Sequence, residues 1–460
     1  MTCKEQSATS IEWAVARNAN AIMGAHGPPN YENEATILFS MRSLVRRYST
    51  SVSYLTVLAV GFGFERFGTH ILETEPLVLG QPFNVLATYT FFAVSFGIWA
   101  LVTPKESRSL TLIAFLLAMA VAWTVHLILY RHHGDAFNYT ALLYSCFLLM
   151  IFVKPPDKFE AQQAIMAFAW SVAFVLVVTR VLEMAGILTI RSQASGVIAF
   201  DEALYFLPLN DLLGIDGRWP GPFGHNGDTA MMGALLIVIG VAFWTRASWV
   251  FIGVGGVTLI LTNGRASIGA AIVGVILVLM FTSNSKVARI PSRWRLTVGT
   301  GTLVAGAVVM FLRPSGLTGR ERIWPAFLEL WWESPLVGVG GSGFATGNEI
   351  TQQFGHAHSL YIEELARSGV IGFVAQFAAL GIGVFIAARA AGLGYPGPLA
   401  VMVAYFVTGI TEPRNNWIEP SATWFLLILM VLAASARLVG EERNRSTDRE
   451  KGSLPSSPPA

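Results

Sequence analysis

The sequence predicts an all-α polytopic membrane protein with about twelve transmembrane helices. Of its 460 residues, 53% are hydrophobic and only 13% are charged, whereas about a quarter are charged in an ordinary soluble domain. Apolar segments that could cross a bilayer recur along the chain, and the strict alternation typical of a membrane β-barrel is missing from the sequence. Because unpaired backbone groups cannot be left in lipid, we expect these segments to be helices.

Windows of about 20 residues, the length that crosses a hydrocarbon core, define the individual segments. Their approximate limits are 50–64, 83–103, 109–130, 136–153, 163–186, 229–244, 247–262, 266–282, 296–312, 369–388, 397–411 and 421–439. The first, seventh and eleventh are short. Together they predict one transmembrane domain over residues 50–439.

The two ends of the chain have a different composition. Residues 1–49 lack a signal-peptide pattern, because the basic cluster of Arg42, Arg46 and Arg47 comes late and no small-residue cleavage site follows the first apolar run. We interpret them as a cytoplasmic tail. Residues 440–460 are charged and then rich in serine and proline, which predicts a disordered cytoplasmic tail.

The distribution of charge predicts the orientation of the protein in the membrane. With the amino terminus inside, the inner connectors hold about twice as many basic residues as the outer ones, as the positive-inside rule requires. Two long connectors, about 187–228 and 313–368, then face the exterior. Arg180 lies within a span, on the same helical face as Glu183. The net charge of +2 gives no argument for nucleic-acid binding.

Several kinds of site are absent from the sequence. The two cysteines, Cys3 and Cys146, lie in such different settings that a disulfide framework is excluded. No Gly-rich loop ends in Gly-Lys-Ser/Thr, which disfavours ATP-driven transport. No Asp-x-Asp and no His-Glu-x-x-His occurs, so we predict no metal site and no cofactor.

The exterior arginines are the first candidates for chemistry. All lysines fall on the predicted inner side, whereas every outer basic residue is an arginine, whose planar fork suits bidentate binding of phosphate. Arg265 lies between two apolar runs that are too close together for a real loop, at the membrane surface or slightly within it. Such a charge usually has a partner. Snorkelling of its side chain to the headgroups is the alternative.

The second long connector contains a predicted amphipathic helix. The motif Gly319-Arg320-Glu321-Arg322 leads into an apolar stripe with the spacing i, i+3, i+4 and i+7, formed by Trp324, Phe327, Leu328 and Trp331. This helix could lie along the outer membrane surface with its tryptophans at headgroup depth, or it could pack as a lid. The glycines that follow, Gly338 to Gly343, favour either close approach to an anion or tight turns.

His358 is the candidate for acid–base chemistry. If its segment is helical, His358, Tyr361, Ile362 and Leu365 share one face. An imidazole with an unperturbed pKa near 6.5 can accept a proton from a hydroxyl at neutral pH, although a lone histidine is more often structural. In the first connector, Asn226 and Asp228 are predicted to cap the next helix. Arg218 and His225 have no such role and stay candidates for binding.

Four motifs in order resemble the O-antigen ligase and polymerase superfamily. They are Gly-Arg265-Ala-Ser at the eighth span, Gly319-Arg320-x-x-Ile-Trp, Pro335-Leu-x-Gly-x-Gly-x-x-x-Phe, and His358-Ser-x-x-x-x-Glu364-x-x-x-x-Gly369. The segment Arg218-x-x-Gly-x-Phe-x-x-Asn226 is similar to an earlier motif of the family. The resemblance covers roughly residues 200–380, and the length and topology agree along the whole chain.

The resemblance implies a membrane glycosyltransferase at the outer face of the bacterial inner membrane. Its donor would be a glycan linked to undecaprenyl pyrophosphate, its acceptor lipid A core or a growing glycan, and its surroundings the membrane lipids. The sugar would be transferred with inversion and without a metal. His358 would be the general base. The pyrophosphate and substrate would be bound by Arg265, Arg320, Arg218, Arg322, His225 and Tyr361.

Three departures from the family pattern leave alternatives open. Gly264 stands where serine is usual, Ser359 stands where asparagine often follows the histidine, and the spacing of His225 and Asn226 fits the pattern only loosely. Ligases and polymerases of O-antigen, capsule or exopolysaccharide share the motifs, so the polymerase is the first alternative to the ligase. A secondary transporter or lipid-linked glycan flippase is the alternative of another class, since many spans and a few membrane charges suit it too.

Overall fold

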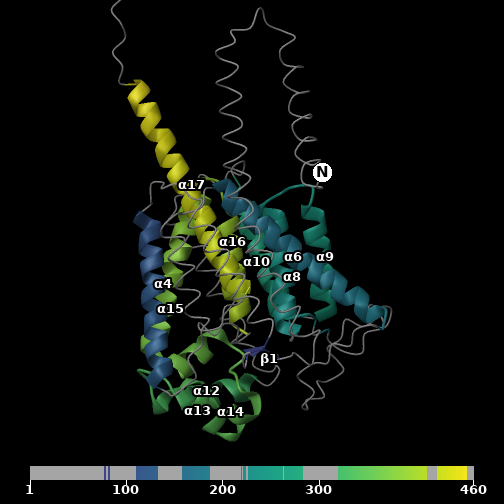
Figure 1. Cartoon of the computed structure of the whole chain (residues 1–460), viewed down its shortest axis with the longest axis vertical. Helices are drawn as coiled ribbons and strands as arrows, with labels where there is room; N and C mark the ends of the chain where they lie inside the picture. The colour runs from purple at the N-terminus through teal and green to yellow at the C-terminus, as the bar shows by residue number, and fades with distance from the viewer. Residues whose placement is uncertain are drawn as a thin grey trace, which may run out of the picture. The chain divides into compact units, whose positions relative to one another are not determined.

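The computed structural model of the chain is helical (Figure 1). It describes residues 77–78, 81–82, 110–132, 158–186, 219, 221–223, 226–262, 264–282, 320–411 and 422–452. All of them belong to the compact unit Val52–Ala460, and the predicted tail over residues 1–49 lies outside them. Within the described residues, the β-structure is an antiparallel pair of short strands, β1 (Leu77–Val78) and β2 (Gln81–Pro82). Apart from this pair, the all-α prediction is confirmed there.

The helices of the described residues follow the predicted apolar segments. Their bounds are α4 (Leu110–His132), α6 (Lys158–Met184), α8 (Asn226–Ala242), α9 (Ser248–Thr262), α10 (Arg265–Phe281), α12 (Arg320–Glu333), α13 (Gly340–Thr346), α14 (Glu349–Phe354), α15 (Leu360–Gly392), α16 (Gly397–Gly409) and α17 (Ala422–Gly452). All of these except α12, α13 and α14 coincide with predicted spans. The first, second, fourth and ninth predicted spans lie outside the described residues.

Several of the described helices have the properties of membrane helices. By length and composition, α6, α15 and residues Thr423–Glu442 of α17 could each cross a membrane, whereas α8, α9, α10, α16 and Leu110–His126 of α4 are apolar but shorter. These helices expose large apolar side chains, such as Ile128, Phe174, Ile272 and Val374. Such surfaces are rare in water-soluble monomers. The membrane character is thus supported, and the number of about twelve crossings stays a prediction.

The described helices pack as a bundle in which α16 contacts α8 and α10 as well as α15 and α17. α8 packs against α9, α10 and α16, while α15 packs against α4, α16 and α17. Gly274 of α10 lies close to two neighbouring helices, because a Cβ atom there would overlap the side chain of Val238 on α8 and lie 3.4 Å from the carbonyl oxygen of Ala400 on α16. Most buried side chains of these helices form one large apolar core, and a smaller cluster of Ala230, Ala234, Leu259 and Ala271 joins α8, α9 and α10, as close packing of small and apolar residues allows.

Close contacts also fix which helix ends lie together. Gly264, which precedes α10, lies against Ala230 near the start of α8, and Gly397 at the start of α16 lies against the last turn of α8. At the other end of α16, Gly409 lies against Leu360 at the start of α15. The starts of α8, α10 and α15 and the end of α16 therefore meet. We call this the site end of the bundle.

Helix α15 is broken at Gly369, whose backbone has φ 61° and ψ −169°. The break leaves amide groups without their helical partners, and a neighbouring segment accepts their hydrogen bonds. Val370 N donates to Pro335 O at 2.9 Å, and Ile371 N donates to Leu336 O at 3.0 Å. The short arm of α15, residues 360–368, can therefore point differently from the long apolar arm without losing backbone hydrogen bonds.

Helix α17 extends beyond its predicted limit. The predicted span ends at residue 439, but the helix continues to Gly452. Arg437 and Glu441, one turn apart, form an ion pair at 4.0 Å across the predicted limit, and such pairs support an exposed helix modestly. The predicted boundary between the membrane domain and the carboxy-terminal tail therefore lies inside a helix.

Candidate functional site

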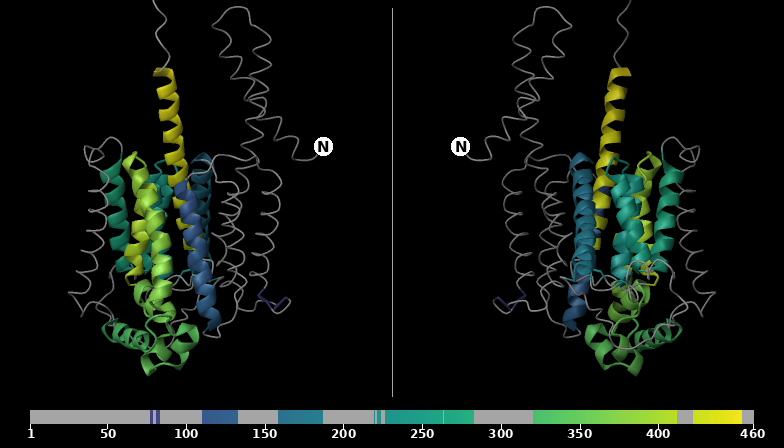
Figure 2. Two further views of the ribbon diagram at one scale, coloured as in Figure 1. Left: turned by 90° about the vertical axis from the view of Figure 1, so that its left-hand side faces the viewer. Right: turned by 90° about the vertical axis from the view of Figure 1, so that its right-hand side faces the viewer.

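A small second core lies at the site end, formed by α12, α13, α14 and the short arm of α15. In both views of Figure 2 these short helices are grouped at one end of the longer helices. Trp324 and Phe327 of α12 are buried, with 5% and 0% of their surface exposed, and Phe327 contacts Phe344 of α13 at a centroid distance of 5.0 Å. The sequence allowed the apolar stripe of this helix either to lie on the membrane surface or to pack as a lid, and Trp324 and Phe327 are found packed.

His358 lies in the loop between α14 and α15. Gly355 ends α14 with a left-handed backbone, and His358 itself has a φ of 50°, which is uncommon for a residue with a side chain. Ser359 is extended and α15 begins only at Leu360. The prediction that His358 shares a helical face with Tyr361 is therefore wrong, because the strained loop backbone orients the imidazole. Such outliers are frequent at functional sites.

A second histidine of the same loop lies beside His358. The ring centroids of His356 and His358 are 4.1 Å apart, and the planes meet at 73°. The Nδ1 atom of His356 is buried, and no hydrogen bond to it is found within the described residues. Burial lowers the pKa of His356 below its ordinary value of 6.5, and the positive charges of Arg320 and Arg367 lower it further. His356 is therefore neutral at neutral pH.

We expect the lowered pKa of His356 to make the protein less stable in mild acid. Because the unfolded chain binds a proton at this histidine more readily than the folded one, its contribution is complete above pH 6.5 and is lost as the pH falls below that value. The apparent melting temperature should therefore decline more in the wild type than in His356→Gln between about pH 7 and about pH 5. Parallel declines of the two proteins would contradict this assignment.

Glu363 connects the histidine loop to α15. One of its carboxylate oxygens accepts the N–H of Ala357, between the two histidines, at 3.2 Å, and the other accepts from Arg367 Nη2 at 2.8 Å. The guanidinium of Arg367 also lies 4.9 Å from the centroid of the Phe344 ring, within cation–π range. Charge-assisted hydrogen bonds of this kind are among the stronger ones, so the short arm of α15 fixes the backbone of the histidine loop.

Arg320 lies next to the histidine loop. It begins α12, and its Nη2 atom donates to the carbonyl oxygen of Thr411 at 2.7 Å. Thr411 follows α16 at the site end, so this bond joins the second core to the bundle. The charge of Arg320 also acts on His356. One predicted binding arginine is thus close to the loop that holds the predicted base.

Arg265 reaches the site end from another helix. It is the first residue of α10, and its side chain is exposed. Only two residues separate it from the end of α9 at Thr262, so the predicted tight connection between the two apolar runs is found. The arrangement of the bundle therefore brings Arg265 to the same end as Arg320 and His358.

These three residues come from one continuous stretch of the chain. Residues 231–377 match the O-antigen ligase family. The match confirms the resemblance that the sequence motifs predicted. No curated protein matches the chain. Members of the O-antigen ligase family are membrane glycosyltransferases of the ligase or polymerase type, and the matched stretch contains Arg265, Arg320 and His358.

The packing of the stretch that matches the O-antigen ligase family explains one departure from the family pattern. Gly264 stands where serine is usual, and a Cβ atom at this position would lie far inside van der Waals contact with the Cβ of Ala230. Glycine therefore lets the connection between α9 and α10 approach the start of α8. The approach also fixes the backbone just before Arg265.

The other residues predicted to bind the substrate are not brought together with the histidine loop by any contact found in the described residues. Arg322, on α12, is exposed. Tyr361 donates its hydroxyl to Phe406 O at 3.0 Å and stacks on Phe377 at 5.3 Å, so its side chain packs α15 against α16. Arg218 and His225 lie outside the described residues.

The predicted pair of membrane charges has a third partner. Arg180 Nη1 lies 3.5 Å from Glu183 Oε2, in agreement with their shared helical face, and Trp219 Nε1 donates to the same oxygen at 2.6 Å. The backbone of Trp219 also donates to Leu261 O at 3.0 Å. These contacts tie the end of the first connector to α6 and α9.

Several residues of the stretch that matches the O-antigen ligase family could not be singled out from the sequence. Glu363 and Glu364 are only 8% and 4% exposed, and nothing in the sequence predicted that these two carboxyl groups would be buried. His356 was not singled out, although its position two residues before His358 was a signal. The spacing of Glu363 and Arg367, one helical turn apart, was another.

Proposed function

We propose that the protein transfers a glycan from undecaprenyl pyrophosphate to a hydroxyl group of lipid A core, at the outer face of the bacterial inner membrane, with both termini in the cytoplasm. The observation that carries this proposal is the position of the histidine loop and Arg320 at the end of the bundle where α10 presents Arg265. The match to the O-antigen ligase family supports the class of reaction.

His358 would act as the general base of this reaction. Its imidazole would take the proton of the acceptor hydroxyl while the hydroxyl oxygen forms a bond to the anomeric carbon of the donor sugar. On the opposite face of that carbon, the bond to the pyrophosphate oxygen breaks, and the electron pair leaves with the undecaprenyl pyrophosphate. Attack from the opposite face inverts the anomeric configuration. General-base catalysis typically contributes about 10²–10⁴-fold.

Arg265 and Arg320 would bind the pyrophosphate, with Arg218, Arg322 and His225 as further candidates. A guanidinium offers five donors in a fixed fork and stays charged, so it can neutralise the charge that develops on the leaving group. The bond from Arg320 to Thr411 O holds this guanidinium in place. Because arginines would supply the positive charge, the proposed reaction requires neither a metal ion nor a cofactor.

Replacing Arg265 with alanine should slow glycan transfer about 10²–10³-fold, by analogy with the removal of one oxyanion donor. The measurement is transfer of glycan from an undecaprenyl-pyrophosphate donor to lipid A core by the purified protein. Arg246→Ala is the matched control, since Arg246 is also exposed but lies just after α8, away from the site end. Equal loss in both variants, or no loss at Arg265, would contradict the proposed binding role.

The same assay separates the ligase from its alternatives. Lengthening of the donor glycan without modification of lipid A core would select the polymerase. A protein that only moves the lipid-linked glycan across a vesicle membrane, without forming a new glycosidic bond, would be a flippase or transporter. Cytoplasmic labelling of cysteines placed at the site end would also exclude the proposed glycosyltransferase.

A further inference from the structure

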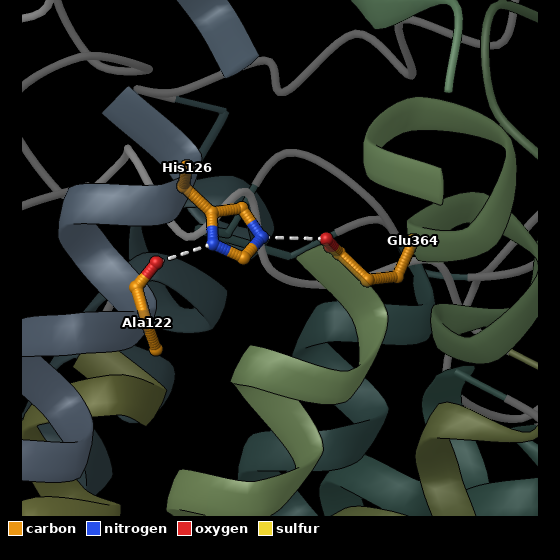
Figure 3. A network of polar contacts seen from close by, with 3 residues as sticks. All are labelled: Ala122, His126 and Glu364. Carbon is orange, nitrogen blue, oxygen red and sulfur yellow. Dashed lines mark hydrogen bonds and ion pairs between the residues drawn. The ribbon is translucent and has the colours of Figure 1, made fainter. Parts of the chain in front are cut away.

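A buried ion pair joins α4 to the short arm of α15 (Figure 3). His126 Nε2 lies 2.7 Å from Glu364 Oε1, and the two side chains are 2% and 4% exposed. The other ring nitrogen, Nδ1, lies 2.7 Å from the carbonyl oxygen of Ala122. The pair spans 238 residues of sequence. Ionisable groups buried in membrane helices are costly and are often functional.

The hydrogen-bond geometry determines how many protons the pair holds. A carbonyl oxygen can only accept, so Nδ1 of His126 must carry a proton and donate it to Ala122. The contact between Nε2 and Oε1 then needs one more proton, because two lone pairs would repel each other at this distance. The pair is therefore either imidazolium with carboxylate or imidazole with carboxylic acid. In both forms it shares one proton and is neutral as a whole.

Glu364 belongs to the segment that fixes the histidine loop. Its neighbour Glu363 holds the loop through the N–H of Ala357 and also binds Arg367. The charge of Arg367 acts on both His126 and His356. The polar groups of the short arm thus connect α4 to the loop beside His358.

The short arm of α15 has contacts with the second core, with α16 and with α4. The break at Gly369 separates it from the long arm of α15, so the arm needs contacts of its own. Its first residue, Leu360, packs against α16, and Tyr361 bonds to Phe406 of the same helix. On the side of α4, Glu364 of the short arm forms a hydrogen bond with His126.

We propose that His126 and Glu364 are positioning residues of the glycosyltransferase site: their shared-proton contact holds the short arm of α15 against α4 and so places the loop of His358. Neither residue touches the substrate in this proposal, which rests on the proposed function. A misplacement of reacting groups by about 1 Å can cost about 10²-fold in rate, so a distant pair can have a large effect.

The test compares variants that break the contact with variants that keep it. In His126→Leu the contact is lost, and we expect kcat for transfer to lipid A core to fall about 10–100-fold while KM for the undecaprenyl-pyrophosphate donor stays within about twofold. In Glu364→Gln the new amide can donate to Nε2 of a neutral His126, so kcat should stay within about threefold of wild type. Glu329→Gln, on the exposed face of α12, is the matched control.

A doubly apolar variant guards against simple misfolding. His126→Leu leaves Glu364 buried without its partner, which can unfold the protein, whereas His126→Leu/Glu364→Leu leaves no unpaired charge and is expected to fold. This double variant should show the same loss of kcat as the single one. Wild-type kcat in a folded double variant would overturn the proposal, as would a loss in Glu364→Gln as large as that in His126→Leu.

Hydrogen–deuterium exchange of residues 355–368 gives a readout that does not depend on activity. Exchange should be faster than wild type in the double variant and unchanged in Glu364→Gln, and unchanged exchange in both would overturn the positioning role. If the wild-type protein transfers no glycan but the exchange results hold, the proposed function fails and the structural link stands. If transfer is normal in every variant, the positioning role fails and the proposed function stands.

Discussion

Replacing His358 with glutamine should lower kcat for glycan transfer by about 10²–10⁴-fold, the largest single-residue effect on activity that we expect. Glutamine can form hydrogen bonds but cannot take up a proton at neutral pH. The loop around this position is held by Gly355 and by the bond from Ala357 N to Glu363, so the substitution should leave its backbone in place. The measurement is steady-state transfer to lipid A core with both substrates varied.

The control for this prediction is His132→Gln, since His132 is an exposed histidine at the end of α4. It should transfer glycan at the wild-type rate. Melting temperatures of the two variants should agree with wild type within a few degrees, which would separate lost chemistry from lost folding. A His358→Gln protein that is folded and keeps more than about a tenth of the wild-type kcat would contradict the role of His358 as the base.

Much of the fold could be predicted from composition and segment length alone. A membrane helix satisfies its own backbone, so an apolar run such as residues 229–244 predicts α8 without knowledge of its neighbours. Boundaries set by tertiary contacts could not be predicted in this way. Helix α15 starts well before its apolar run because a separate backbone segment accepts the hydrogen bonds at the Gly369 break.

The candidate site was predictable where residue type alone carries the chemistry. The predicted outer side has arginines but no lysine, which indicated Arg265 and Arg320, and a histidine in a sequence motif indicated His358. The surroundings of His358 were not predictable, since they depend on where distant residues meet. His126 is a lone histidine in an apolar run, and its partner Glu364 lies 238 residues away. The helical face assumed for His358 failed because the positive φ of that residue is a local feature without a periodic signal.

Replacing Gly369 with alanine should destabilise the protein by about 3 kcal/mol or more, the largest effect on folding that we expect. The backbone at this position, φ 61° and ψ −169°, is accessible almost only to glycine. A Cβ atom here would also overlap the backbone carbonyl of Leu336, which accepts the hydrogen bond of Ile371 N. Relief of the clash would require the segment from Pro335 to Gly338 to move away, and its bonds to α15 would be lost.

Gly338 allows the same prediction to be tested from the other side of the contact. Its φ is 72°, and a Cβ atom there would overlap the backbone of Arg367, so Gly338→Ala should show a similar loss. The two variants together should lose less than the sum of the single losses, because both disrupt one contact. The apparent melting temperature in detergent should fall by about 5 °C or more in each single variant.

Gly381 is the matched control, because it lies on the same helix and a Cβ atom there meets nothing within 4 Å. Alanine is the better helix former by about 0.5–1 kcal/mol, so Gly381→Ala should melt at or slightly above the wild-type temperature. An equal fall in Gly381→Ala and Gly369→Ala would mean that α15 tolerates no added methyl group anywhere, and the close backbone contact at the break would then not be the cause. A Gly369→Ala protein with wild-type stability would show that α15 can run unbroken through this position, and the short arm would then have no separate direction for His126 and Glu364 to fix.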